Sequence, residues 1–311
     1  MAATAERQTT TIGNFIRGAL MGAVETVPGM SAGTIALVVG IYGRILDTAS
    51  HGVTAIRRLV TGPNRWASAK ESFSRMDWKL IVPLLIGMIV AVFSLASPIS
   101  YLVDTYPELT RAVFFGMVLA STSVPLRLAG LSYIRWYQVL CGVVAGILTF
   151  WLVSLPPASL EPQPFIIILA AALAVCALLL PGLSGMFVVL TFGLYETTLD
   201  AISNVDLQYL GLFAIGLAIG LISIVKVLQW LLTHRHRITL VVLTGVMLGA
   251  LRSLWPWQTE GRELKAPGTD WPTVLLLGIA GFAVVAVLSY VDARLTNKQL
   301  AEKAAQEVLG E

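Results

Sequence analysis

The sequence contains a Pro-Gly-x-Ser pattern twice, each time directly after an apolar run. The first copy reads Pro28-Gly29-Met30-Ser31-Ala32-Gly33-Thr34, and the second begins Pro181-Gly182-Leu183-Ser184-Gly185, about half the chain further on. The register then continues without a gap, because Gly40-Ile41-Tyr42 follows the first copy as Gly193-Leu194-Tyr195 follows the second. A repeat of this length in an apolar chain predicts a pseudo-symmetric, transporter-like fold.

Each copy is expected to break the chain into two helices. Its proline cannot continue the preceding helix, since proline lacks an N–H group and clashes with the turn before it. The glycine permits a tight reversal, and the serine is a suitable N-cap for a second helix. The break residues are Pro28, Gly29, Pro181 and Gly182. A loop between two ordinary helices would explain a single copy, but two copies in register favour a break that is buried or lines a wet cavity.

The composition excludes a soluble globular protein. Hydrophobic residues make up 56% of the chain and charged residues 13%, with a mean hydropathy of +0.79, and most helix-length segments are apolar all round. No Walker loop or dinucleotide motif occurs, which argues against ATP-driven transport by this chain alone. Cys141 and Cys176 lie in apolar segments and the histidines in predicted loops, so we expect no disulfide, metal or cofactor. We also expect no nucleic-acid partner.

The apolar segments predict two halves of similar layout. Residues 1–11 should form a disordered cytoplasmic end, and 294–311 a polar, helical cytoplasmic tail. Repeat 1 (12–160) is expected to contain a hairpin (12–46) with helices Ile12–Val24 and Ser31–Leu46, a polar and basic loop (Ser50–Trp78), and spans at 80–97, 109–126 and 136–155. Repeat 2 (161–293) is expected to contain a hairpin (165–202) with helices Phe165–Leu180 and Ser184–Ile202, and spans at 207–232, 238–254 and 272–291.

The positive-inside rule places the basic loops and both termini in the cytoplasm. The first arm, of about a dozen residues, covers roughly 18–20 Å, which is too short for a hydrocarbon core of ~30 Å. A re-entrant hairpin is therefore favoured, although two full spans would return the chain to the same face. The first hairpin then enters from the cytoplasm and the second from outside. The sequence thus predicts an all-α polytopic membrane protein with an inverted-topology repeat.

Charged residues inside these apolar segments are candidates for function. The cationic candidates are Arg17, Arg111, Lys226 and Arg252; snorkelling is the alternative for the last three. Two helix N-termini that meet near the midplane would attract an anion. The expected phosphate-binding groups are the side chains of Ser31, Thr34 and Ser184 and the N–H groups of Ala32, Gly33 and Gly185. We expect Ser31 and Ser184 to lie near one another at mid-membrane depth.

Glu25 is the candidate for coupling to a proton gradient. It lies just before the first break, and Arg17 lies two turns earlier on the same arm. A carboxylate in a poorly solvated cavity can exchange a proton as the site alternates between wet faces, while Arg17 would draw in the phosphate. The alternative is a static ion pair between Arg17 and Glu25 that fixes the hairpin.

The segment from Glu25 to Thr34, the following Gly40-Ile41-Tyr42, and Leu254-Trp255-Pro256 resemble a family of bacterial membrane proteins, the undecaprenyl-phosphate (polyprenyl-phosphate) transporters of the PopT type. The resemblance covers nearly the whole chain. It implies a multi-pass protein of the bacterial cytoplasmic membrane that flips the lipid-carrier phosphate from the outer to the inner leaflet, for peptidoglycan and other envelope polymers. The second copy has Gly185-Met186 in place of Ala32-Gly33-Thr34 and lacks the hydroxyl group.

The alternative is an enzyme. Integral-membrane undecaprenyl-pyrophosphate phosphatases resemble this chain in their inverted repeats and their Pro-Gly-x-Ser motif, but there an arginine follows the serine. Here that position is Ala32 in one copy and Gly185 in the other, and no second acidic residue accompanies Glu25 at a spacing suited to a metal. Translocation is therefore favoured over hydrolysis. A structural or assembly protein without a transported ligand would leave the duplicated breaks unexplained. The oligomeric state stays open, with a homo-oligomer as one option.

Overall fold

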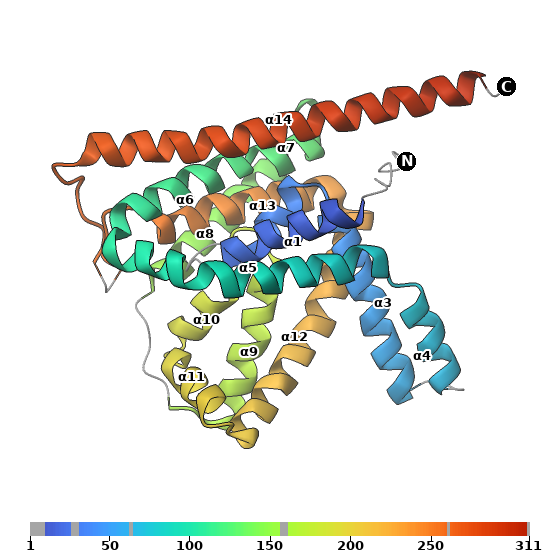
Figure 1. Cartoon of the computed structure of the whole chain (residues 1–311), viewed down its shortest axis with the longest axis horizontal. Coiled ribbons are helices and arrows are strands. Elements are labelled where there is room, and N and C mark those ends of the chain that lie inside the picture. The colour runs from blue at the N-terminus through green and yellow to red at the C-terminus, as the bar shows by residue number, and fades with distance from the viewer. Residues whose placement is uncertain (1–9, 26–30, 62–64, 156–160, 260–261, 310–311) are drawn as a thin grey trace.

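The computed structural model describes residues 10–25, 31–61, 65–155, 161–259 and 262–309 (Figure 1). These residues form helices and no strand. Two of the predicted break residues, Pro28 and Gly29, lie outside the described residues. The first half contains α1 (Thr11–Glu25), α2 (Ala32–Val38), α3 (Tyr42–Thr61), α4 (Arg65–Ser74), α5 (Trp78–Thr105), α6 (Pro107–Ser121), α7 (Ser123–Ala129), η1 (Leu131–Tyr133) and α8 (Trp136–Ser154). The second half contains α9 (Pro164–Leu179), α10 (Gly185–Thr191), α11 (Tyr195–Ser203), α12 (Leu207–His234), α13 (His236–Ala250), η2 (Leu251–Leu254) and α14 (Trp271–Leu309).

Within the described residues, six helical segments are long and apolar enough to cross a membrane. They are Trp78–Leu95, Pro107–Ala129, Trp136–Ser154, Leu207–His234, His236–Leu254 and Trp271–Tyr290. Each overlaps one of the six segments that the sequence predicts as spanning. The prediction of an all-α polytopic membrane protein is confirmed.

Both hairpins differ from the prediction in their second arm, which is two helices rather than one. The chain turns at Gly40 between α2 and α3, and at Gly193 between α10 and α11. Both glycines have a left-handed backbone, with φ of 71° and 72°, which other residues adopt only at a cost. Ile41 N donates to Ala36 O at 2.9 Å to close the first turn, and the same kind of bond recurs at Leu194. The prediction of one continuous helix per arm is wrong for this reason.

The segment Ser50–Trp78, predicted as a loop, is largely helical. Its residues continue α3 to Thr61 and form α4, which packs back along α3. Arg58 Nη1 holds the pair together, since it donates to Ser68 O (3.2 Å) and Ser72 Oγ (2.9 Å). A search for apolar segments misses polar helices of this kind. The last span and the tail, predicted as separate elements, form the single helix α14.

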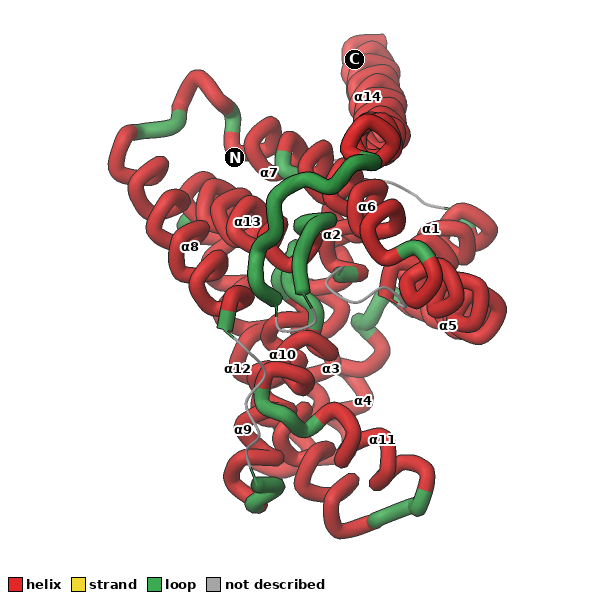
Figure 2. The backbone as a smooth tube through the Cα atoms, turned by 90° about the vertical axis from the view of Figure 1, so that its left-hand side faces the viewer, coloured by secondary structure: helices red, strands yellow, loops and turns green. Residues whose placement is uncertain are grey.

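Four helix pairs make up the bundle. α1 packs along α5, α9 along α12, α6 along α14, and α8 along α13. Figure 2 is viewed nearly along α14 and shows α6 next to α14, α8 next to α13, and α1 next to α5. Two of these pairs join helices from different halves of the chain, so the halves are interlocked rather than separate domains.

The same backbone contact occurs in the two pairs that stay within one half. A Cβ on Gly87 of α5 would lie 2.1 Å from Phe15 O of α1, and a Cβ on Gly216 of α12 would lie 2.4 Å from Ile168 O of α9. Phe15 and Ile168 each stand 13 residues before the proline of their copy. Only glycine fits such an approach without movement of the backbone, so both helix pairs depend on it.

The two pairs that exchange helices between the halves are likewise alike. A Cβ on Gly116 of α6 would lie 1.9 Å from Gly278 O of α14, and a Cβ on Gly245 of α13 would lie 1.9 Å from Gly142 O of α8. The backbones of α6 and α14 therefore meet through glycine, as do those of α8 and α13. Small residues at such crossings are typical of helices that associate in membranes.

Candidate functional site

The two Pro-Gly-x-Ser copies lie against each other. Ser31 Oγ donates to the carbonyl oxygens of Leu178 (3.3 Å) and Leu180 (3.4 Å), directly before the second break. Thr34 Oγ1 accepts a hydrogen bond from Gly182 N at 2.8 Å. The structure thus brings Ser31 and Thr34 of the first copy against residues 178–182 at the second break. The hydroxyl groups of the first copy bind the main chain of the second.

Tyr42, just after the turn at Gly40, adds a further contact of this kind. Its hydroxyl donates to Leu179 O at 2.7 Å, and burial raises its pKa above the usual value. Tyr42 belongs to the sequence repeat, where it corresponds to Tyr195, but it was not predicted as a site residue. Its side chain therefore helps to hold the end of α9 at the break.

The two serines differ in how they cap their helices. Ser31 has an extended backbone, and its side chain accepts a hydrogen bond from Gly33 N at 3.1 Å, as an N-cap does. Ser184 stands at the N-cap position of α10, but its side chain makes no cap hydrogen bond. The expectation of two equivalent caps is wrong for Ser184. Gly185 lies against α9, because a Cβ there would meet Ala174 O at 2.7 Å.

Glu25 holds the N–H group at the start of α2. Ala32 N donates to Glu25 Oε2 at 3.0 Å, while Gly33 N donates to Ser31 Oγ and Thr34 N to Ser31 O. Ser31 and Thr34 are almost completely buried, at 0% and 1% exposure. The N–H groups of Ala32 and Gly33, predicted to bind phosphate, are therefore engaged within the protein in this arrangement. A carboxylate oxygen occupies the place of an anion at Ala32.

The four predicted cationic residues are held by different partners. Arg17 Nη1 donates to Asn14 Oδ1 at 3.4 Å, one turn earlier on α1. Arg111, on α6, has Glu108 as a charged neighbour. Lys226 binds α3, and Arg252 binds the loop after η2 through Gln258 Oε1 and Arg262 O. The hydrogen bonds described for Lys226 and Arg252 are thus made with α3 and with the loop after η2, not with the residues of the two breaks.

Arg262 is a buried cation that sequence reasoning missed. Its Nη1 donates to Leu155 O (3.0 Å) and Thr191 Oγ1 (3.2 Å), so it links the end of α8 to the end of α10. Its backbone is left-handed, with φ of 64°. Burial, and then the positive charge of Arg252, lower the pKa of Arg262. No sequence pattern indicates this role, because the surrounding loop is polar and of mixed charge.

Cys141 of α8 and Cys176 of α9 are free thiols. Among the described residues, no group of three or more His, Cys, Asp and Glu side chains is placed to hold a metal ion. The polar groups at the contact of the two breaks are hydroxyl groups, main-chain amides and one carboxylate.

We expect Thr34→Val to destabilise the contact between the breaks. Valine keeps the shape but leaves the buried Gly182 N–H group without its acceptor, which costs about 1–3 kcal/mol. Thr244→Val is the matched control, because Thr244 is equally buried but bonds only to its own helix, at Leu240 O. Thermal unfolding of the purified protein in detergent checks this. Equal melting temperatures for the two variants would contradict the assigned role of Thr34.

Comparison with known proteins places these features in a family. The model of the undecaprenyl phosphate translocase-like family matches residues 21–270. A polyprenyl-phosphate transporter of Vibrio cholerae is 34% identical over 265 residues, which cover 84% of this chain and 83% of that protein. A polyprenyl-phosphate transporter of Staphylococcus aureus is 29% identical over 299 residues, covering 90% and 96%. No solved structure matches the chain significantly.

Proposed function

Because the chain belongs to the undecaprenyl phosphate translocase-like family, we propose that it carries a polyprenyl phosphate, undecaprenyl phosphate in the first place, from the outer to the inner leaflet of the bacterial cytoplasmic membrane. The six apolar helices suit a multi-pass protein in a bilayer. Both relatives are named as transporters of this class of lipid. The single observation that carries the proposal within the fold is the contact between the two breaks, where the buried N–H group of Ala32 already holds a carboxylate.

The proposed transport path follows from an inverted repeat. In this proposal each half enters the membrane as a re-entrant hairpin and adds three spans, with both termini in the cytoplasm. The recurring glycine contacts of α5 with α1 and of α12 with α9 support two halves built alike. In folds of this kind the binding site lies where the repeats meet, near the midplane. The contact of Ser31 and Thr34 with residues 178–182 joins the two halves in this way.

The phosphate is proposed to replace Glu25 at α2. A deprotonated Glu25 accepts the hydrogen bond from Ala32 N, and a protonated one binds it more weakly, because charge-assisted hydrogen bonds are the stronger ones. Protonation would therefore free Ala32 N for a phosphate oxygen, with the hydroxyl groups of Ser31 and Thr34 beside it. Return of the charge to Glu25 would release the phosphate, which couples transport to protons.

The runner-up is hydrolysis of undecaprenyl pyrophosphate. The break region offers Ala32 and Gly185 at the positions where the phosphatases that it resembles have arginine, and both relatives are named transporters rather than phosphatases. We therefore treat the chain as a transporter and not as an enzyme.

Ligand-induced stabilisation tests the substrate class. A ligand that binds the native protein raises its melting temperature, and the stabilisation grows with the logarithm of the ligand concentration relative to Kd. We expect undecaprenyl phosphate to stabilise the purified protein, and undecaprenol and phosphatidic acid to stabilise it much less. Release of phosphate from undecaprenyl pyrophosphate is measured in the same preparation. Strong hydrolysis together with no preference for the monophosphate would favour the phosphatase instead.

A further inference from the structure

Lys226, about two turns before the end of the apolar helix α12, is bound by α3 from the other half of the chain. Its Nζ donates to Ser50 O (3.2 Å), Ser50 Oγ (2.7 Å) and Thr54 Oγ1 (2.8 Å). All three acceptors are neutral oxygens. The charges of Arg57 and Asp47, which have opposite signs, also act on Lys226. None of the hydrogen bonds described for the ammonium group is with a carboxylate.

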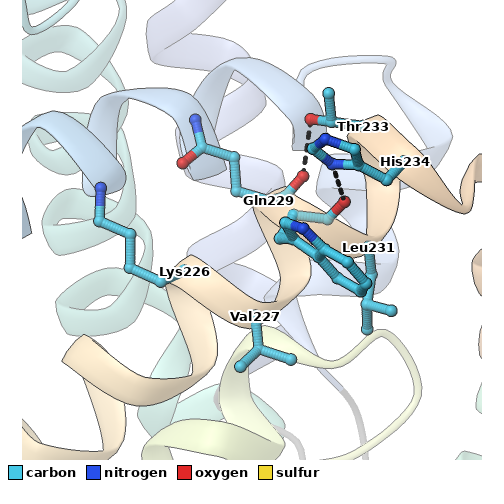
Figure 3. A pocket seen from close by; sticks show the side chains of 7 residues that line it. Lys226, Val227, Gln229, Leu231, Thr233 and His234 are labelled. Atoms are coloured by element: carbon cyan, nitrogen blue, oxygen red, sulfur yellow. Dashed lines mark hydrogen bonds between the residues drawn. The ribbon is translucent and has the colours of Figure 1, made fainter.

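Gln229, one turn further along α12, completes the contact. Its Nε2 donates to Asp47 Oδ1 at 2.8 Å, and its Oε1 accepts from Ser50 Oγ. Figure 3 shows Lys226 and Gln229 on the same side of α12, with Val227 and Leu231 on the other. We call Asp47, Ser50, Thr54, Lys226 and Gln229 the α3–α12 latch. Polar contacts between apolar helices fix one arrangement of those helices.

The latch has no counterpart of similar extent in the described structure. α3 and α11 are the second arms of the two hairpins, and α5 and α12 are the helices that follow the hairpins, each starting at an aspartate N-cap (Asp77 and Asp206). Both second arms pack on α12, whereas α11 makes no comparable contact with α5. The two halves therefore differ at this point, and the latch is closed on one side of the molecule.

We propose that the α3–α12 latch closes the inner-leaflet side of the lipid path and that the phosphate group of the lipid opens it by taking Lys226 from α3. This rests on the proposed function and adds a second phosphate subsite, away from the breaks. An anionic phosphate oxygen is a stronger acceptor for an ammonium group than the carbonyl and hydroxyl oxygens of Ser50 and Thr54. Once Lys226 turns to the phosphate, the hydrogen bonds of Gln229 with Asp47 and Ser50 are the part of the latch that still joins α3 to α12.

A cross-linking experiment tests the latch directly. Asp47→Cys and Gln229→Cys are introduced together, with Cys141 and Cys176 replaced by alanine, and the protein is reconstituted in phosphatidylglycerol–phosphatidylethanolamine vesicles. A short bifunctional methanethiosulfonate reagent joins the two cysteines while the latch is closed. We expect undecaprenyl phosphate in the vesicles to slow this reaction several-fold, and undecaprenol of the same length to leave it unchanged. Inorganic phosphate alone shows whether the headgroup is sufficient.

The variant Lys226→Gln provides the second arm of the test. We expect its cross-linking rate to be low and insensitive to lipid, while Ser223→Ala, an exposed hydroxyl that bonds only within α12, behaves like the parent. Translocation of undecaprenyl phosphate is followed in the same vesicles. If translocation is intact but undecaprenyl phosphate does not change the cross-linking rate, the proposed latch is wrong and the transport function is unaffected. Loss of translocation in the parent protein overturns the transport function instead.

Discussion

Gly182→Ala is expected to reduce lipid transport at least tenfold and to lower the melting temperature of the protein. Gly182 has φ of +93°, a conformation that costs a residue with a side chain roughly 1–2 kcal/mol. The added Cβ would also lie 2.8 Å from Met247 Cα, a main-chain atom of α13 that can move only with its helix. A shift of the main chain at Gly182 or of α13 would pull Gly182 N away from Thr34 Oγ1, to which it donates a hydrogen bond of 2.8 Å.

The control for this variant is Gly211→Ala. Gly211 lies on α12 with nothing within 4 Å of an added Cβ, and alanine is the better helix former by about 1 kcal/mol. We expect this variant to transport normally and to be equally or more stable. Transport in vesicles and thermal unfolding in detergent are measured for both. If Gly182→Ala matches Gly211→Ala in both measurements, the close contact at the second break has no part in function.

Glu25→Gln is expected to abolish the dependence of transport on external pH and to slow transport strongly. Glutamine keeps the shape, and its carbonyl oxygen can still accept the hydrogen bond from Ala32 N, so the fold should remain. It cannot, however, take up or release a proton. In the proposed cycle, acidification of the outer side protonates Glu25 and frees Ala32 for the phosphate, so wild-type transport should accelerate as the external pH falls.

Glu71→Gln is the matched control for this second prediction. Glu71 is an exposed carboxylate of α4 that pairs with Arg75. It has no assigned role in the proposed transport cycle. Initial transport rates are measured for both variants and for the parent protein over a range of external pH at constant internal pH. A Glu25→Gln variant with the parent's rate and pH profile would show that Glu25 only fixes the hairpin.

Much of the fold can be predicted from the sequence, because helices that span a membrane are recognised by their long apolar segments. The six long apolar segments could be placed to within a few residues, since the bilayer sets their length. The turns at Gly40 and Gly193 could not, because a single glycine in an apolar run is compatible with a helix that continues. α4 was missed for the opposite reason. It is a short, polar helix that is held by its contacts with α3, such as Arg58 to Ser72.

The residues of the candidate site could be predicted from the sequence, but the hydrogen bonds between them could not. The repeat indicated that Ser31 and the second break belong together, and the structure places them in contact. The sequence could not show that Glu25 already accepts a hydrogen bond from Ala32 N, because that depends on how the end of α1 is placed relative to the start of α2. Nor could it show that Lys226 binds Ser50, a partner 176 residues away. Long-range pairs of this kind are set by helix packing and leave no local pattern.

Leaflet-resolved transport of undecaprenyl phosphate is the most direct test of the central claim. Purified protein is reconstituted in vesicles, the lipid is placed in the outer leaflet, and the fraction accessible to a membrane-impermeant phosphatase outside is followed with time. We predict that this fraction falls rapidly with the protein, slowly without it, and slowly again with Gly182→Ala. An accessible fraction that falls at the same rate in vesicles with and without the protein would contradict the assignment as a polyprenyl-phosphate transporter.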